Sequence, residues 1–477
     1  MFISLERFGT ITDLGLGLHW DAATLAREVE RRANVLAELK IGRGSIVAIA
    51  HSGSANFFAD LFATWQTGAA AACLDDTLTK HELENILDFA RPSALLVTAT
   101  RPIGNSSVPK LELVLAPPGA AHELSGFEPD DPALILFTSG TTGNPKGVVL
   151  TFRALFARIA LNQDVIGRDA LASTLVTLPT HFGHGLIGNA LTPLMAGGEI
   201  VLHRTGIRLA QNLRRIVDQH RITFMSSVPA LWPLVMKLCD APALGSLRRV
   251  HIGSAPLSCQ IWSDVASWTR AEVVNCYGTT ETANWLAGAS SVRDGIANGR
   301  VGRMWGGRVA VAIDDNEILA RGEGEILVQT PALMSGYFRR ADLTAEVIRG
   351  GWYYTGDRGI VDASGVIELT GRIKDEINRA GSKIQPAEID LLLENHPAVA
   401  EACVFGIEDQ TAGNIVAAAI RLVDGSNETT EGLRSWCRQR LRREAVPERW
   451  FLLPEIPRNA RGKIGRDAVR RHVLGIH

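Results

Sequence analysis

The sequence predicts an α/β protein of layered sheets, with a small β-rich subdomain and a smaller α+β unit at the C-terminal end. Three observations lead to this prediction. Helical and strand-like patterns alternate over residues 21–100 and again over 171–277. Short strand-like segments with glycine turns replace them from about 300 to 370, and the charge density rises sharply after Gly371. Alternation of helices with buried strands is typical of sheets that helices cover.

The first alternating region predicts three helices and three strands. The helices have apolar residues at helical spacing, and the strands are short apolar runs. We expect helices at 22–39, 56–66 and 80–89, and strands at 45–50, 70–74 and 94–97.

The later regions predict more strands and a domain boundary. The second alternating region has strand-like runs at 174–178, 199–202, 248–252 and 272–275. The β-rich region has them at 309–313, 324–329, 360–362 and 366–370. A helix is expected to begin near Pro386, because proline is favoured in the first helical turn. We place the boundary at 371–375 and expect domains at 1–371 and 372–477.

Composition and charge exclude several classes of protein. The chain has 477 residues, with 49 Lys+Arg against 51 Asp+Glu, a net charge of −2. This balance disfavours nucleic-acid binding, which usually needs a basic surplus. No apolar run reaches the length of about 18 residues that a membrane span needs, and the N-terminus lacks the pattern of a secretory signal. The six cysteines are scattered without a CxxC pair, which is typical of reduced thiols. We therefore expect a cytoplasmic enzyme.

The clearest motif lies within residues 134–150, where a loop connects two strand-like runs. Small residues let backbone N–H groups turn toward one anion, and hydroxyls and an ammonium add further donors. This chemistry suits a polyphosphate, whereas the alternative is a flexible hairpin turn. The candidate ligands are Thr138, Ser139, Gly140, Thr141, Thr142 and Lys146.

The loop is not a Walker A motif. Counted from Gly140, the second required glycine falls on Pro145, and Gly147 stands where the Ser/Thr after the lysine should be. The hydroxyl that binds magnesium in that motif is therefore missing, so we expect the metal to be held elsewhere.

With this loop and the motifs below, the chain resembles the adenylate-forming (ANL) superfamily from about residue 20 to 470. That superfamily comprises acyl-CoA synthetases, adenylation domains and luciferases. The resemblance implies a large N-terminal nucleotide-binding and acyl-binding domain and a small mobile C-terminal domain. Residues 253–258 and 275–281 match its adenine and phosphate motifs, although the first alone would be an ordinary turn.

The resemblance assigns ATP-binding roles to the residues of these two motifs. Tyr277 would be the plate for the base, and Glu281 would be the magnesium ligand that the loop lacks. A structural salt bridge is the alternative for Glu281. The remaining ATP-binding candidates are Gly253, Ser254, Ala255, Asn275, Gly278, Thr279 and Thr280.

The resemblance also assigns roles in the second half of the chain. Asp357, which we expect after a tight turn, would accept the ribose hydroxyls, and Arg372 would contact ribose and phosphate. Lys374 matches the hinge, and Gly381 would line the tunnel for the thiol arm. Lys463 matches the catalytic lysine that reaches the carboxylate and the α-phosphate. A solvated lysine in a basic tail is the alternative for Lys463.

Residues 178–185 resemble the border of the acyl pocket, with His181 or Phe182 closing over the substrate beside Gly278. His181 and His184 have the HxxH spacing of a zinc site. Neither a third ligand pattern nor a glutamate base accompanies them, so zinc is not expected.

The motifs together predict an ATP-dependent acid–thiol ligase. A carboxylic acid and Mg·ATP would give an acyl-adenylate, and the acyl group would pass to coenzyme A. The first alternative is a stand-alone enzyme that loads a carrier-protein phosphopantetheine. A luciferase-like oxygenase and a non-catalytic nucleotide sensor are more distant alternatives. The substrate would be an acyl or aryl acid without an α-amino group, and a homodimer is possible.

Overall fold

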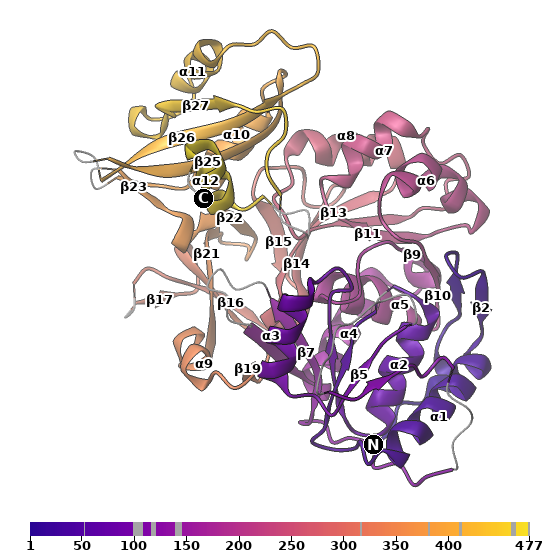
Figure 1. The fold of residues 1–477 in the computed structure, drawn as a ribbon. Coiled ribbons are helices and arrows are strands. Elements are labelled where there is room, and N and C mark those ends of the chain that lie inside the picture. Colours follow the sequence, from indigo (N-terminus) through magenta and orange to yellow (C-terminus); the bar gives the residue numbers. More distant parts are fainter. Residues whose placement is uncertain are drawn as a thin grey trace.

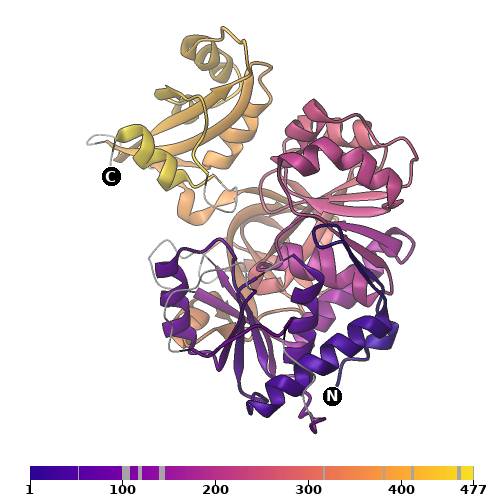
Figure 2. The same cartoon turned by 45° about the vertical axis from the view of Figure 1, so that its right-hand side comes forward.

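The computed structural model describes residues 1–51, 53–98, 108–115, 121–138, 146–314, 317–379, 382–409, 413–458 and 464–475. These residues form three β-sheets with helices against them (Figure 1). Two sheets belong to the chain up to Arg372, and the third belongs to the chain beyond it. Figures 1 and 2 both show the third sheet and its helices as a separate lobe. The predicted α/β architecture with a smaller C-terminal unit is confirmed.

The first sheet is formed by the N-terminal alternation of helices and strands. Its order is β19-β8-β7-β4-β3-β5-β6, and β7, β4, β3 and β5 are parallel. The strands are β3 (Ile46–Ile49), β4 (Ala70–Cys73), β5 (Ala94–Leu96), β6 (Lys110–Leu111), β7 (Pro132–Thr138), β8 (Lys146–Thr151) and β19 (Gly336–Tyr337). The helices of this region are α1 (Ala22–Glu38), α2 (Ala55–Gln66) and α3 (Lys80–Ala90). All six elements predicted here are present, and their ends agree with the prediction within one residue.

Local sequence explains where these helices begin. The side chains of Asp21, Ser54 and Thr79 accept hydrogen bonds from backbone N–H groups of the first turns. Such caps pair donors that a helix start would otherwise leave unpaired. β7 and β8 are antiparallel neighbours, so the strand–loop–strand arrangement predicted around the glycine-rich loop is confirmed.

The second sheet begins with the strands of the second alternating region. Its parallel strands follow the order β13-β12-β11-β9-β10-β1, and β2 pairs with β1. They are β1 (Ile11–Asp13), β2 (Leu18–Trp20), β9 (Ser173–Val176), β10 (Glu199–Leu202), β11 (Phe224–Ser227), β12 (Arg249–Ile252) and β13 (Glu272–Thr279). The helices are α4 (Phe152–Ile166), α5 (Thr192–Met195), α6 (Ile207–Gln219), α7 (Leu231–Leu238), α8 (Cys259–Thr269), the short helix η2 (Ala170–Ala172) and the π-helix η3 (His184–Leu191).

β13 continues four residues beyond the predicted 272–275. Its first half pairs with β12, and its second half pairs only with β14, which returns antiparallel after η4 (Thr280–Thr282). The sequence of this second half contains Gly278 and Thr279 and therefore resembles a loop. Pairing with β14 keeps this half extended, and the strand propensities of its residues do not reveal that pairing.

The β-rich region continues the same sheet. β15 pairs with both β14 and β22, so hydrogen bonding runs from the parallel half into this region. The strands are β14 (Asn284–Ser290), β15 (Arg300–Met304), β16 (Arg308–Ala312), β17 (Ile318–Leu319), β18 (Gly322–Gln329), β20 (Ile348–Arg349), β21 (Trp352–Val361) and β22 (Ile367–Arg372), with helix α9 (Ala341–Val347). The tight turn expected before Asp357 is wrong: Thr355, Gly356 and Asp357 all lie within β21. Gly356 has a positive φ of 72°, but β21 continues through it in the same direction.

The third sheet forms the C-terminal lobe, in the order β24-β23-β26-β25, with β27 beside β26. Its strands are β23 (Ile377–Arg379), β24 (Ser382–Ile384), β25 (Val399–Asp409), β26 (Gly413–Leu422) and β27 (Arg449–Leu452). The helices are α10 (Pro386–Glu394), α11 (Thr430–Arg438) and α12 (Arg466–Leu474). Pro386 opens α10, as predicted. A short helix, η5 (Ile373–Asp375), connects β22 to this lobe.

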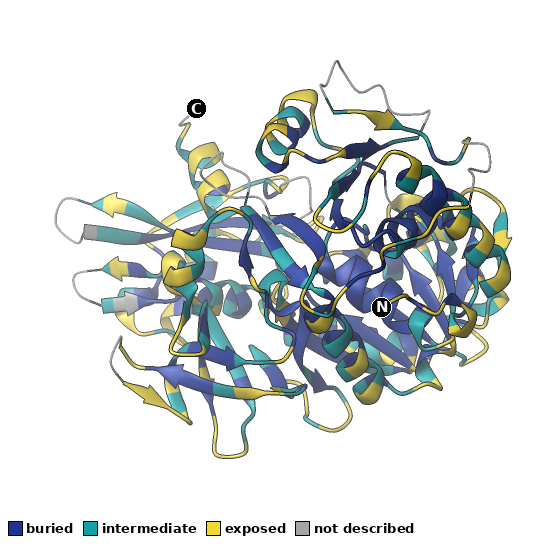
Figure 3. Cartoon of the chain, turned by 90° about the horizontal axis from the view of Figure 1, so that it is seen from below, coloured by how far each residue is buried: buried dark blue, intermediate teal, exposed yellow. Residues whose placement is uncertain are grey.

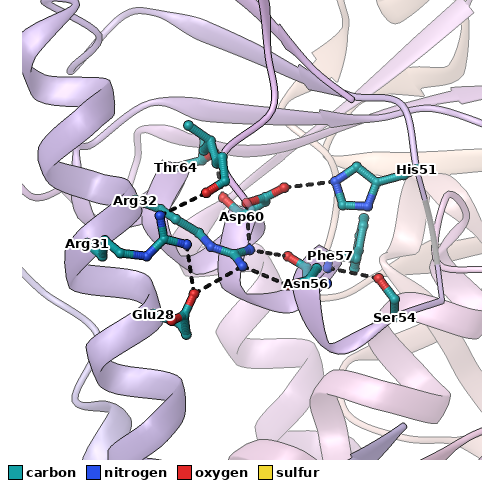
Figure 4. A network of polar contacts seen from close by, with 10 residues as sticks. Glu28, Arg31, Arg32, His51, Ser54, Asn56, Phe57, Asp60 and Thr64 are labelled. Carbon is teal, nitrogen blue, oxygen red and sulfur yellow. Dashed lines mark hydrogen bonds and ion pairs between the residues drawn. The ribbon is translucent and has the colours of Figure 1, made fainter. Parts of the chain in front are cut away.

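Figure 3 shows that buried residues are concentrated in the strands, whereas exposed residues lie on helix faces, connections and some strand ends. Between α1 and α2 the core includes an ionic network, drawn in Figure 4. The guanidinium of Arg32, 1% exposed, donates 2.8 Å to Asp60 and 2.7 Å to Asn56. His51 lies 2.8 Å from the other oxygen of Asp60. A buried ion pair is tolerated when both charges are also hydrogen-bonded, as they are here.

The six cysteines are unpaired, and four of them are buried. This agrees with the expectation of reduced thiols. None of the helices in the described residues is both long and apolar enough to cross a membrane.

Candidate active site

A first group of site residues lies where the glycine-rich loop ends. Lys146 is the first residue of β8, and its Nζ lies 3.9 Å from Oε1 of Glu281 in η4. Tyr337 of β19 donates a 2.8 Å hydrogen bond to the same oxygen. The ammonium also lies 3.8 Å from the centre of the Tyr337 ring, a cation–π contact. The fold thus brings together Lys146 and Glu281, which the sequence indicated separately.

Burial affects the charges of this group. It lowers the pKa of Lys146, and the nearby Glu281 carboxylate opposes that shift. Burial raises the pKa of Tyr337, and Glu281 raises it further. Tyr337 therefore keeps its proton at neutral pH and remains a hydrogen-bond donor to Glu281.

Tyr337 and its neighbour Tyr353 are not among the residues predicted from the sequence. Burial raises the pKa of Tyr353, and Glu281 and Tyr337 add to the shift. One feature of the sequence could have indicated them, namely that tyrosine is rare in this chain. The chain has only four tyrosines, and Tyr277, Tyr337 and Tyr353 all belong to this site.

A second group of site residues is centred on Asp357. Tyr277 donates a 2.6 Å hydrogen bond to Oδ2 of Asp357, and Nε of Arg372 lies 2.9 Å from Oδ1. Asp357 and Arg372 are directly opposite each other in the β21–β22 pair. Each carboxylate oxygen keeps a second lone pair, so Asp357 can also accept the two hydroxyls of a ribose. Burial raises the pKa of Asp357 against the effect of Arg372, and Asp357 raises the pKa of Arg372.

β13 and the short helix that follows it connect the two groups. Tyr277 belongs to the second group and Glu281 to the first, only four residues later. A Cβ on Gly278 would lie 1.9 Å from the backbone oxygen of Asn284, so only glycine allows β14 to approach here. Gly278 itself is exposed.

The other predicted ATP-binding residues surround β13. Asn275 is buried, and its amide donates 2.8 Å to the backbone oxygen of Arg300. Thr279 and Thr280 are half-buried. Gly253 follows β12, Ser254 has a positive φ of 67°, and Ala255 is exposed. The predicted turn after β12 is present.

The histidines of residues 178–185 have different partners. Nε2 of His181 lies 3.3 Å from Asp75, and its ring packs edge-on against Phe182. His184 is hydrogen-bonded to Ser254 at 2.7 Å and to Ser226 at 2.6 Å. The two rings therefore do not converge on one point. In the part of the chain that the structure describes, no cluster of three or more His, Cys, Asp or Glu residues could hold a metal ion.

Several predicted site residues lie outside the described residues: Ser139, Gly140, Thr141, Thr142, Gly381 and Lys463. Of Thr138 only the backbone, at the end of β7, is described. Lys374 lies in η5, between the second sheet and the C-terminal lobe.

The donor set fits magnesium. Carboxylate oxygen is a hard ligand, and Mg²⁺ is commonly held by one or two carboxylates together with the phosphates of a nucleotide. Tyr337 and Lys146 both lie at Oε1 of Glu281, and within the described residues Oε2 has no protein partner.

A lysine and a carboxylate lie together where the glycine-rich loop ends, and a second buried carboxylate lies between a phenol and a guanidinium, an arrangement that suits a nucleotide. The AMP-binding enzyme model matches residues 15–338, and the model of the C-terminal domain of these enzymes matches residues 388–463. The chain belongs to the AMP-binding enzyme family, and the predicted family and acid–thiol ligase class are confirmed.

Similar proteins are CoA ligases and their relatives. "Probable CoA ligase CCL9" of Humulus lupulus is 29% identical over 96% of this chain and 92% of its own length. "Fatty acid--[acyl-carrier-protein] ligase ScoC" of Streptomyces coeruleorubidus is 32% identical over 94% and 91%. The solved O-succinylbenzoate coenzyme A synthetase of Bacillus subtilis, in complex with ATP and magnesium ion, is 25% identical. It has a TM-score of 0.87 and covers 98% of this chain and 97% of its own.

Proposed function

We propose that this enzyme activates a carboxylic acid with Mg·ATP and then transfers the acyl group to the thiol of coenzyme A. In the first step a carboxylate oxygen attacks the α-phosphorus, and pyrophosphate leaves. In the second step the thiol loses its proton, its sulfur attacks the acyl carbon, and AMP leaves. The observation that carries the proposal is the joining of two groups through β13: Lys146, Glu281 and Tyr337 for phosphates, and Tyr277, Asp357 and Arg372 for a nucleoside.

Each residue has a role that its surroundings support. Lys146 and the glycine-rich loop would bind the phosphates, and Glu281 would bind magnesium, which neutralises phosphate charge when bound. Asp357 would accept the ribose hydroxyls, with Tyr277 and Arg372 keeping its carboxylate in place. Because Tyr337 is a donor, it would orient Glu281 for the metal.

The chemical step needs a cation where charge develops at the α-phosphate, and we assign that role to Lys463. The thiol step needs the same space, so we propose that the unit formed by residues 372–477 rotates about Lys374 and that the thiol arm then passes Gly381. The short helix η5 has no buried residue, which suits such a pivot.

The names of the relatives support two different acceptors for the acyl group. The name of one relative specifies CoA, and that of another specifies an acyl carrier protein. We propose coenzyme A as the acceptor, and the holo-carrier protein is the second candidate. A homodimer and a cytoplasmic location remain predictions, although six unpaired cysteines suit a reducing compartment.

The substrate would be an acyl or aryl acid without an α-amino group. His181, Phe182 and Gly278 are the proposed border of its site. The carboxylate of Asp75 lies beside this border, and it is already paired with His181 at 3.3 Å. It is therefore poorly placed to hold a substrate ammonium as well.

Pyrophosphate exchange into ATP, measured against a panel of fatty, aryl and amino acids, tests the first step. We expect exchange with at least one fatty or aryl acid and none with amino acids. Asp357→Asn should raise the ATP concentration needed. The activated acid is then offered CoA or a holo-carrier protein, and thioester formation is measured. No exchange with any acid would refute the activity, and transfer to the carrier alone would favour the second candidate.

A further inference from the structure

Arg158 of α4 is a buried charge that the proposed chemistry does not use. Its side chain is completely buried, and the described residues place no carboxylate within ion-pairing distance of it. Burial lowers its pKa to about 10. A charged group in such a place is costly unless its surroundings need it.

The guanidinium donates to three segments that are distant in sequence. Nε donates 3.3 Å to the backbone oxygen of Thr282, and Nη1 donates 3.3 Å to that of Trp305. Nη2 donates 3.3 Å to the hydroxyl of Thr330. A planar fork with five N–H donors can connect several acceptors at once, which an ammonium cannot do in the same geometry.

Two of these segments carry two residues of the first group, Glu281 and Tyr337. Thr282 directly follows Glu281. Thr330 begins the connection that leads to Tyr337, and within that connection Met334 donates 2.7 Å to the backbone oxygen of Glu281. The hydrogen bond from Tyr337 to the Glu281 carboxylate is a second contact between these two segments.

Helix α4, which carries Arg158, is also connected to Lys146, the third residue of the first group. α4 begins directly after β8, and Thr151, the last residue of β8, caps it by accepting from the N–H of Ala154. β8 begins at Lys146. Arg158 therefore lies on the helix that continues from the strand of Lys146, and its side chain contacts the segments of both Glu281 and Tyr337.

We propose that Arg158 is a positioning residue for metal binding: it orients Glu281 and Tyr337 so that magnesium and the triphosphate can bind beside Lys146. The inference depends on the proposed role of Glu281 as magnesium ligand. Removal of Arg158 should leave Glu281 present but poorly oriented. Residues that orient a metal ligand typically change metal affinity by about ten-fold or more.

The matched control is Arg249 of β12. It is also a buried arginine that donates to backbone oxygens, to Val165 at 2.8 Å and to Ile166 at 3.3 Å. Its carboxylate partner is Glu272, at 3.1 Å. Arg158→Met and Arg249→Met each remove a buried guanidinium, but only the first changes the surroundings of Glu281.

The test measures Mn²⁺ binding, by electron paramagnetic resonance, to the full-length enzyme with a non-hydrolysable ATP analogue. We expect Arg158→Met to weaken Mn²⁺ about ten-fold and Arg158→Lys to weaken it less. Arg249→Met should lower the melting temperature without changing Mn²⁺ affinity. Unchanged Mn²⁺ affinity in Arg158→Met, or an equal loss in Arg249→Met, would overturn the inference.

Glu281→Gln separates this inference from the proposed function. If that variant binds Mn²⁺ normally, the assignment of the metal ligand fails. If it loses Mn²⁺ while Arg158→Met does not, only the role of Arg158 fails. Should the Arg158 variants not fold, Thr330→Val carries the test, because it removes one acceptor of the guanidinium and keeps the arginine. We expect it to weaken Mn²⁺ binding about two-fold, since one hydrogen bond is lost, and unchanged affinity would refute the inference.

Discussion

At the scale of single residues, the site depends on a few charged groups that are partly removed from water. Lys146 lies between a carboxylate and an aromatic ring, and Asp357 between a phenol and a guanidinium. Contacts to charged groups are about twice as strong as neutral ones and are stronger where water is scarce. Substitutions here should therefore change nucleotide binding more than stability.

Lys146→Ala should raise the ATP concentration required for pyrophosphate exchange. The lost charge-assisted contact is worth about 1.5–3 kcal/mol, which is about 10- to 150-fold in affinity. The measurement is the apparent KM for ATP at fixed acid and magnesium. Unchanged ATP dependence would show that the loop does not bind phosphate.

Tyr337→Phe keeps the ring beneath Lys146 but removes the hydrogen bond to Glu281. We expect a higher magnesium requirement, by about three- to ten-fold, because the hydrogen bond to a charged group is lost. The matched control is Tyr354→Phe, since Tyr354 is also buried and packs beneath Arg349, 3.8 Å from its ring centre. Equal magnesium titrations for the two variants would contradict the role of Tyr337.

At the scale of elements, helix α10 ends with a half-buried acid, Glu394. Burial and the neighbouring Asp390 raise the pKa of Glu394 from 4.5 to about 8. The folded protein therefore binds more protons than the unfolded chain between these pH values. Stability from this group is fully present below pH 4.5, falls as the pH rises to about 8, and is level above it.

Glu394→Gln should remove that pH dependence. Each unit of pKa shift corresponds to about 1.4 kcal/mol, and solvent screening at the partly exposed Glu394 reduces its contribution to stability to about 1–2 kcal/mol. Urea denaturation of both proteins at several pH values between 5 and 9 measures the difference in unfolding free energy. The stability of the variant should increase relative to that of the wild type as the pH rises, and parallel curves would argue against a protonated Glu394.

At the scale of the whole molecule, one site serves two reactions, and the C-terminal lobe is connected to it by a short segment. The ion pair of Arg358 with Glu376, at 3.4 Å, and the contact of Gln385 with Glu376, at 3.0 Å, lie just beyond η5. Both contacts are present in the orientation that the C-terminal lobe has in this structure. A rotation about residues 372–375 would have to break or rebuild the contact between Arg358 and Glu376.

The two half-reactions should therefore separate in two variants. Lys463→Ala should abolish adenylate formation and spare thioester formation from supplied acyl-adenylate. Lys374→Pro should impair the thiol step first, because proline restricts φ and removes a donor at the pivot. The measurements are pyrophosphate exchange and thioester formation in each variant. Equal loss of both steps in both variants would rule out the alternation.

The sequence by itself determined much of this protein. The helices and strands of the first sheet follow from apolar spacing and caps, the phosphate loop follows from its small residues and lysine, and the family follows from its ordered motifs. All of these signals are local. The order of motifs also indicated Glu281, Asp357 and Arg372 individually, without showing what each would touch.

Only the tertiary structure decided which residues meet. Tyr337 and Glu281 are 56 positions apart, and Tyr277 and Asp357 are 80 positions apart. Their contacts depend on strand order: β19 adds to the edge of the first sheet beside β8, and β21 pairs with β22 in the second. The same cause explains the wrong turn before Asp357 and the unexpected length of β13, because cross-strand pairing outweighs the local preference of glycine for turns. Arg158 is the clearest example, since its three acceptors follow β13, β15 and β18 and become neighbours only when the second sheet has formed.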